Sequence, residues 1–187
     1  MVKKNACVFI SGTGSNLKKL IQSSRNYNFP INIKLVISNK KSAAGLDFAR
    51  KYSIPFKVIN TKDNLFEIRL LNEIHKRKIS LICLAGYMKI LSKNFIKTYK
   101  GRIINIHPSL LPKYKGTNTF ARMLKNNEKI AGCTVHFVNE KLDSGKIIIK
   151  KSFTLSKNEN TETLKKKTQR VEYRAFSAAI TKIHVMN

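Results

Sequence analysis

Asn105 and His107 carry the clearest chemical signal in the chain, because they end a short run rich in isoleucine. Residues two apart on a strand point to the same face, so the amide and the imidazole are expected to lie together. In open α/β sheets, ligands bind beyond the carboxyl ends of strands, where this pair falls. An amide donor beside an acid–base group suits stabilisation of a tetrahedral oxyanion. A capping asparagine and a hydrogen-bonded histidine without a catalytic role are the equally open alternative.

Asp143 raises a second chemical question, since the chain has only three aspartates. It lies in the run Leu142-Asp-Ser-Gly145, between two late apolar stretches. Taken locally, this run is ordinary turn chemistry. If the carboxylate reaches His107, however, it favours the charged imidazole and raises the pKa of the ring toward neutrality or above. The sequence therefore makes Asp143 a catalytic residue only on that condition.

A glycine-rich loop, Ser11-Gly-Thr-Gly-Ser-Asn16, follows the first apolar run and precedes a helical pattern. Its glycines let the backbone approach a ligand, and a helix N-terminus offers free N–H groups and partial positive charge. The loop lacks a third glycine and the Lys-Ser/Thr pair of a P-loop, which disfavours a dinucleotide or a triphosphate. It predicts a site for a single phosphate, and a turn that binds no ligand is the open alternative.

The elements that must position these residues alternate between short apolar runs and helical patterns, which indicates a mostly parallel sheet covered on both faces. The late stretches are expected to be antiparallel or edge strands. The fold class is therefore α/β, a twisted, mostly parallel sheet with helices on both faces. We expect strands at 6–10, 33–37, 56–59, 81–85, 102–106, 134–138 and 146–153, and helices from residue 15 and at 43–52, 65–78 and 160–183.

Two of the predicted helices have an apolar face that should point inward. In the helix at 65–78 it consists of Leu65, Ile68, Leu71 and Ile74. In the helix at 160–183 it consists of Leu164, Val171, Ala175, Ala178 and Ile183. No internal repeat, linker or low-complexity tail interrupts the pattern, so residues 1–187 are predicted to form one domain with halves at 1–100 and 101–187.

The formal net charge of +27, from 37 lysines and arginines against 10 acidic residues, taken alone suggests a nucleic-acid partner. The basic residues are scattered from Lys3 to Lys182, however, and the chain is rich in Lys, Asn and Ile and has no Trp. The codons of Lys, Asn and Ile are the richest in A and T, so a biased genome explains the charge without selection for binding. We prefer that explanation to nucleic-acid binding, and the charge still favours anionic ligands.

The cysteines, Cys7, Cys83 and Cys133, lie in apolar stretches without a Cys-x-x-Cys pair and are predicted to be reduced core thiols of a cytoplasmic protein. No apolar run has the length of a membrane span, and no signal-peptide cleavage pattern follows the N-terminus. No His, Cys or acidic residues have metal-ligand spacing, so no metal is expected. His136 alternates with apolar neighbours and is interpreted as a hydrogen-bonded sheet residue.

An ordered set of motifs resembles the folate-dependent formyltransferases, and within them the phosphoribosylglycinamide branch. The resemblance implies a single Rossmann-like formyltransferase domain. It also implies transfer of a formyl group from 10-formyltetrahydrofolate to the amine of glycinamide ribonucleotide, the third step of de novo purine biosynthesis. The motifs are Ile10-Ser-Gly-Thr-Gly-Ser-Asn16, Leu84-Ala-Gly-Tyr-Met-Lys-Ile-Leu91, Asn105-Ile-His-Pro-Ser-Leu-Leu-Pro112, Thr134-Val-His-Phe137 and Leu142-Asp-Ser-Gly145.

The resemblance assigns a role to each matched residue. Asn105 would stabilise the oxyanion, His107 would act as acid and base, and Asp143 would set the state of His107. Residues 1–100 would then be the phosphate-binding half and residues 101–187 the catalytic and folate-binding half. The ribonucleotide would contact Gly14, Ser15, Asn16 and Glu172, and the folate would contact Met88, Lys89, Ile90, Leu91, Asn105, Asn139, Glu140, Lys141, Leu142 and Asp143.

Two other functions are alternatives to the one that the resemblance implies. A methionyl-tRNA formyltransferase-like enzyme shares the catalytic residues and would explain the basic surface, but that family normally adds a C-terminal domain and lacks the Ser-Gly-x-Gly-Ser-Asn loop. An inactive basic α/β module that binds nucleic acid would have no use for Asn105, His107 and Asp143. We expect two small-molecule substrates, no membrane, and a monomer or weak homodimer. In the expected mechanism, Asn105 and protonated His107 stabilise the oxyanion.

Overall fold

The computed structural model describes residues 2–60, 63 and 65–185. The chain divides into two compact units that meet between Ile104 and Asn105. Strand β5 (Arg102–His107) crosses this division, so its first half belongs to the first unit and its second half to the second. Each unit is described in turn.

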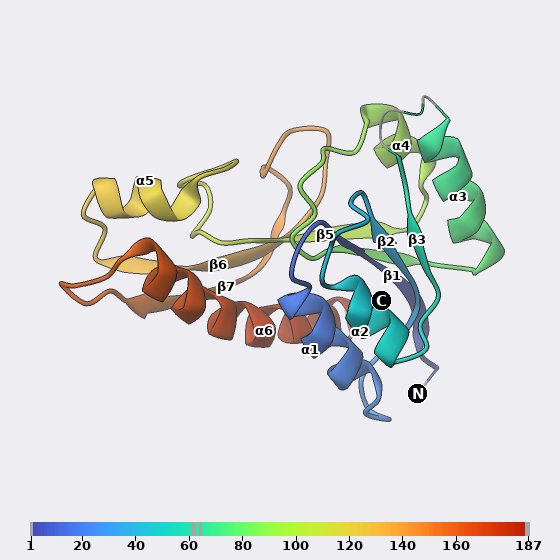
Figure 1. Ribbon diagram of the computed structural model, residues 1–187, viewed down its shortest axis with the longest axis horizontal. Coiled ribbons are helices and arrows are strands. Elements are labelled where there is room, and N and C mark those ends of the chain that lie inside the picture. Colours follow the sequence, from blue (N-terminus) through green and yellow to red (C-terminus); the bar gives the residue numbers. More distant parts are fainter. Residues whose placement is uncertain (1, 61–62, 64, 186–187) are drawn as a thin grey trace. The chain divides into compact units, whose positions relative to one another are not determined.

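The first unit alternates strands and helices along the chain (Figure 1). Its strands are β1 (Lys4–Ile10), β2 (Ile31–Ser38), β3 (Phe56–Val58) and β4 (Leu81–Leu84). Its helices are α1 (Ser15–Ser24), α2 (Leu46–Lys51), α3 (Phe66–Lys76) and α4 (Lys93–Thr98). The strands β1, β2 and β4 are apolar along most of their length because helices cover both faces of a parallel sheet.

The strands of the first unit lie in the order β3-β2-β1-β4 and pair in parallel. The chain therefore moves outward from β1 to β3 and returns across β1 to form β4. Parallel crossovers are right-handed, so α1 and α2 lie on one side of the strands and α3 on the other (Figure 1). The winding reverses between β1 and β4, and ligands of such sheets bind beyond the strand ends at this point.

The second unit contains the end of β5, α5 (Thr119–Lys125), β6 (Ile130–Phe137), β7 (Ile147–Thr154) and α6 (Thr161–Val185). Strand β7 pairs with β6 in the antiparallel sense, and α6 packs along both strands (Figure 1). The backbone N–H of Phe137 donates to the carbonyl of Lys146 at 2.9 Å and closes the turn between these strands. At Gly145 a Cβ would lie 1.7 Å from the Phe137 carbonyl oxygen, so this turn requires glycine.

The predicted fold class is confirmed. Over the described residues, the seven strands follow the order β3-β2-β1-β4-β5-β6-β7, parallel among β1 to β4 and antiparallel at the late β6–β7 pair. The predicted elements are all found, with ends that shift by a few residues. The short helices α4 and α5 were not predicted. The single-domain expectation and its division at residue 100 stay predictions.

The predicted apolar face of α3 is wrong in part. Leu65 is the residue before the helix, and both it and Ile68 are more than half exposed. Leu70 and Ile74 are the buried residues of this helix. A spacing of three residues drifts around a helix of 3.6 residues per turn, so the predicted set does not lie on one face. In α6, Leu164, Ala175 and Ile183 are buried as expected, but Ala178 is exposed and Ala179 takes its place.

The three cysteines are buried and unbridged, as predicted. Burial is the main cause that raises the pKa of each thiol, well above 9.0 for Cys7 and to about 12 for Cys133. Among the described helices, none is long and apolar enough to span a membrane.

The difference in burial between Ile74 and Ile68 of α3 gives a prediction about stability. Ile74→Ala should lower the free energy of unfolding by about 2–5 kcal/mol, since it removes a fully buried side chain and leaves a cavity. The matched control Ile68→Ala, on the exposed stripe of the same helix, should change it by no more than about 0.5 kcal/mol. Chemical denaturation of the three proteins measures both values, and equal losses would contradict the observed face.

Candidate active site

Strand β5 places the Asn105 and His107 side chains on one face, as the spacing of two predicts. Asp143, in the loop between β6 and β7, meets both of them. Its Oδ2 lies 3.3 Å from Nδ1 of His107, and its Oδ1 lies 3.5 Å from Nδ2 of Asn105. The side chains of His107 and Asp143 are only 6% and 7% exposed, so the pair is buried. The Asp143 carboxylate therefore reaches His107, which was the condition for a catalytic role of this residue.

The partners of His107 decide which ring nitrogen carries a proton. Nε2 lies 2.8 Å from the backbone carbonyl oxygen of Tyr114, and a carbonyl oxygen only accepts. Nε2 is therefore the protonated nitrogen of the neutral ring, and Nδ1 faces the Asp143 carboxylate with its lone pair. A second proton taken up at Nδ1 would complete a charge-assisted bond to that carboxylate.

The pKa of His107 shifts in the direction opposite to the one expected. Burial penalises the charged ring and lowers the pKa below 6.5, although the Tyr114 carbonyl and Asp143 both raise it, and electrostatic interactions with His136 and Arg122 add to the lowering. The expectation of a raised pKa is wrong because it counted the carboxylate and not the loss of water. At neutral pH the imidazole of the free protein is thus neutral and able to accept a proton.

The Asp143 carboxyl responds differently to the same burial. Burial raises its pKa, but the contact with His136, the N–H of Gly116 at 2.8 Å and the charge of His107 outweigh that effect and lower it below 3.8. Asp143 is therefore ionised at neutral pH. Its backbone has φ of 46°, a left-handed conformation that turns the side chain into the site.

His136 belongs to this cluster, which the sequence did not indicate. Its Nδ1 donates to the Phe137 carbonyl at 2.8 Å, so in the neutral ring Nε2 accepts. Nε2 lies 3.2 Å from Nδ2 of Asn105 and 3.6 Å from Oδ1 of Asp143. Alternation along the strand showed that His136 would point to one face of the sheet, but not that this face carries Asn105.

The Asn105 amide is held by two long contacts. Its Nδ2 group reaches His136 and Asp143 at 3.2 and 3.5 Å, beyond the usual length of a strong hydrogen bond. Both amide hydrogens thus make only long contacts with their acceptors in the free protein. An oxyanion is a stronger acceptor than either, so donation to it would replace one of these contacts.

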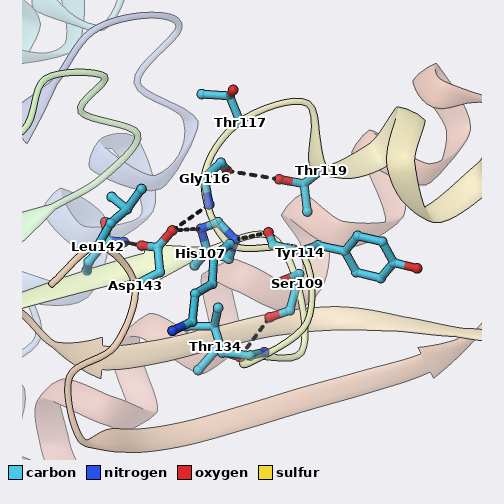
Figure 2. A network of polar contacts seen from close by, with 12 residues as sticks. His107, Ser109, Tyr114, Gly116, Thr117, Thr119, Thr134, Leu142 and Asp143 are labelled. Carbon is cyan, nitrogen blue, oxygen red and sulfur yellow. Dashed lines mark hydrogen bonds and ion pairs between the residues drawn. The ribbon is translucent and has the colours of Figure 1, made fainter.

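The loop after β5, residues 108–118, is tied to β6 and to Asp143 (Figure 2). Thr134 Oγ1 donates to the Ser109 carbonyl at 2.7 Å and accepts from the Leu111 N–H at 3.0 Å. The Gly116 N–H then reaches the Asp143 carboxylate. These bonds bring the Tyr114 carbonyl to His107, and Figure 2 shows its ring pointing away from the imidazole.

In the first unit, Ser11 joins three loops beyond the strand ends. Its hydroxyl donates to Oδ1 of Asn39 at 2.5 Å and accepts from the N–H of Met88 at 2.8 Å. These partners follow β2 and β4, so the predicted phosphate loop and the predicted folate segment 88–91 share one anchor. Met88 and Ile90 are mostly exposed, whereas Leu91 is buried and would contact a ligand through its backbone only.

The start of α1 has the features of an anion site. Gly14 has φ of 70°, and a Cβ there would lie 2.4 Å from Cα of Gly45, so the loop requires glycine at this position. The first turn of α1 has no acidic residue and no side-chain cap. Ser15 is half-buried and Asn16 is buried at the same end of the helix.

The remaining predicted contacts lie in the second unit. Asn139, Glu140, Lys141 and Leu142 are exposed in the loop that carries Asp143. Glu172 is buried on α6, and its charge contributes to the raised pKa of Cys133. None of the described residues forms a group of three or more His, Cys, Asp or Glu side chains that could hold a metal ion.

Comparisons with known proteins agree with this geometry. The model of the formyl transferase family matches residues 4–180. A curated relative, phosphoribosylglycinamide formyltransferase from Haemophilus influenzae, is 38% identical over 181 residues, which cover 95% of this chain and 85% of the relative. The solved phosphoribosylglycinamide formyltransferase from Brucella melitensis superposes with a TM-score of 0.92 at 39% identity, covering 97% of this chain and 95% of that one.

The chain is also similar to part of a much longer protein. The trifunctional purine biosynthetic protein adenosine-3 of Homo sapiens is 41% identical over 184 residues. These residues cover 95% of this chain but only 18% of that protein. The chain thus spans less than a fifth of the length of this relative.

The contact between His107 and Asp143 gives a prediction about pH. Asp143→Asn should lower the NMR titration midpoint of His107 further below 6.5, because it removes a carboxylate that raises this pKa. Glu140→Gln, in the same loop but exposed, should leave the midpoint in place. A wild-type midpoint at or above 6.5 would contradict the dominance of burial.

The lowered pKa of His107 also determines how the stability of the protein changes with pH. A group whose pKa is lower in the folded protein contributes stability that is present above its unfolded value and lost as pH falls through its folded value. Stability from neutral His107 should therefore decline below about pH 6.5 in the wild type. That part of the decline should be missing in His107→Asn, as followed by denaturant unfolding between pH 7 and pH 5.

Proposed function

This chain belongs to the formyl transferase family, whose model matches residues 4–180, and we propose that it transfers a formyl group from 10-formyltetrahydrofolate to the amine of glycinamide ribonucleotide. The products are the N-formylated ribonucleotide and tetrahydrofolate. The observation that carries this proposal is the contact of Asn105 and the buried His107, at the end of β5, with the buried carboxylate of Asp143. The near-complete match to phosphoribosylglycinamide formyltransferases supports this substrate over a transfer RNA.

His107 is the proton carrier of the proposed reaction. The amine nitrogen attacks the formyl carbon, a new C–N bond forms, and the carbonyl electron pair moves to oxygen. Because burial keeps His107 neutral at the start, its unprotonated Nδ1 takes up the proton that the amine loses, and the ring becomes an imidazolium. It then returns this proton to N10 of the folate as the C–N10 bond breaks and the carbonyl re-forms.

Asn105 and Asp143 stabilise the two charges that the reaction creates, on the oxyanion and on the imidazolium. Nδ2 of Asn105 donates to the oxyanion in place of its long contact with His136 or Asp143. Oδ2 of Asp143 lies beside Nδ1 of His107 and stabilises the imidazolium. Because Asp143 is already ionised, it needs no proton of its own at any step.

Gly14, Ser15 and Asn16 are proposed to bind the phosphate of the ribonucleotide. The first turn of α1 supports this assignment, since it has no side-chain cap and no acidic residue, and the N-terminus of a helix favours an anion. Glu172 is proposed to contact the glycinamide moiety, and the buried position of this carboxylate on α6 is consistent with a specific role.

Residues 88–91 and residues 139–143 are each proposed to contact the folate-derived formyl donor. The exposed apolar side chains of Met88, Ile90 and Leu142 support this assignment, because they offer apolar surface to an aromatic ring system. The family membership supports a folate donor in general, and the residue contacts are part of the proposal.

The proposal is tested by the release of tetrahydrofolate, followed by absorbance with and without glycinamide ribonucleotide. Release should require the ribonucleotide, and His107→Ala should reduce turnover by about 10²–10⁴-fold, the usual contribution of a general acid–base group. Calorimetry should show that His107→Ala still binds the ribonucleotide. The control His75→Ala removes an exposed histidine of α3 and should retain full activity.

Other outcomes would assign another reaction. Release without any acceptor would indicate a hydrolase. Formylation of methionyl-tRNA in place of the ribonucleotide would indicate the other branch of the family. If His107→Ala loses binding and turnover to the same extent, the proposal that the phosphate loop binds the ribonucleotide while His107 carries the proton is wrong.

A further inference from the structure

Tyr114 combines a strained backbone with a contact to His107. Its φ is 58°, a left-handed conformation that is rare for a bulky aromatic residue. Strain of this kind persists only where the surrounding structure holds it, and it is often found at functional sites. The strained residue is also the one whose carbonyl accepts from Nε2 of His107 at 2.8 Å.

The side chain of Tyr114 is held on the side away from His107 (Figure 2). Its hydroxyl donates to Oε1 of Glu128 at 2.8 Å and accepts from Nδ2 of Asn126 at 3.0 Å. The guanidinium of Arg122 lies 5.3 Å from the ring centroid. The ring also packs against the buried cluster of Met123, Ala131 and Leu164.

Glu128 is a strong acceptor for this hydroxyl. Its side chain is 20% exposed and also accepts from Nζ of Lys113 at 2.9 Å. The bonds from Lys113 and from Tyr114 lower the pKa of its carboxyl, so it is ionised near neutral pH. Hydrogen bonds to an ionised acceptor are stronger than those between neutral groups.

We propose that Tyr114 is a positioning residue, anchored through its hydroxyl on Glu128, that holds its carbonyl against Nε2 of His107 and so fixes the tautomer and orientation of the imidazole. The step from this anchor to turnover rests on the proposed function, since it assumes that His107 carries the proton. The anchor itself concerns the free protein. It therefore has a readout that does not depend on any substrate.

Tyr114→Phe isolates this role, because it removes one hydroxyl and changes no charge near His107. The titratable and charged groups that face His107 are Asp143, His136 and Arg122, and all three are retained. The Thr134 bonds to the loop and the contact between Gly116 and Asp143 are also retained, so His107 stays buried. The variant therefore loosens the carbonyl and leaves the rest of the site in place.

The experiment is an NMR titration of His107 in the wild type and in Tyr114→Phe, with the resonance assigned by its loss in His107→Asn. The midpoint should fall in the variant, since the Tyr114 carbonyl raises the pKa of His107. The kcat for formyl transfer should fall by about five-fold, the order expected for one hydrogen bond, and KM for the ribonucleotide should not change.

Variants of Glu128 and Lys113 provide matched controls. Glu128→Ala removes the acceptor and should reproduce both effects. Glu128→Gln keeps a carbonyl oxygen that accepts from the Tyr114 hydroxyl and should restore most of the wild-type behaviour. Lys113→Met removes the other partner of Glu128 without touching Tyr114, and it should leave the His107 midpoint and kcat unchanged.

An unchanged midpoint in a folded Tyr114→Phe protein would overturn the proposal. A raised midpoint would also overturn it, because it would mean that Tyr114 covers His107 and does not position it. If Tyr114→Phe does not fold, as judged by thermal melting, Glu128→Ala against Glu128→Gln decides the question. If the wild type transfers no formyl group, the proposed function fails while the titration still tests the anchor.

Discussion

The buried contact between His107 and Asp143 is the interaction on which the site in the second unit depends. Removing two ionisable groups from water is costly, so the protein must supply partners that water would otherwise provide. Here these partners are backbone groups, the Tyr114 carbonyl on one side and the Gly116 N–H on the other. The left-handed backbone at Tyr114 and Asp143 is the conformational cost of delivering them. The loops around the site are thus shaped by the need to supply polar partners to a buried histidine and a buried carboxylate.

Much of this site could be predicted from the sequence, and the misses have physical causes. The period of two along a strand was enough to place Asn105 and His107 on one face, and the turn residues marked the loop of Asp143. His136 was interpreted as a hydrogen-bonded sheet residue, but its contacts with Asn105 and Asp143 were not predicted, because they depend on the register between strands, which the pattern of a single strand does not specify. The direction of the His107 shift depends on burial, which exists only in the folded chain. On α3, two neighbouring apolar stripes compete, and tertiary packing selects Leu70 and Ile74.

The large positive charge gives the few carboxylates unusually many partners. Glu128 accepts from Lys113 and Tyr114, and Glu159 accepts from Ser156, Thr163 and Lys167 beside the start of α6. These bonds lower the pKa of Glu159 to about 2. In a chain with a net charge of +27, these carboxylates thus hold several neighbouring side chains together. The excess of positive charge favours anionic ligands at the surface.

The buried cysteines can report local opening in each unit. Cys7 and Cys83 lie within the first unit and Cys133 lies on β6 of the second. A thiol reacts as the thiolate, and burial both hides these sulfurs and raises their pKa, so the closed protein is nearly inert to alkylating reagents. Labelling can proceed only through states in which a strand has separated from its neighbours. The order in which the three sulfurs become labelled therefore records which part of the chain opens first, without any introduced probe.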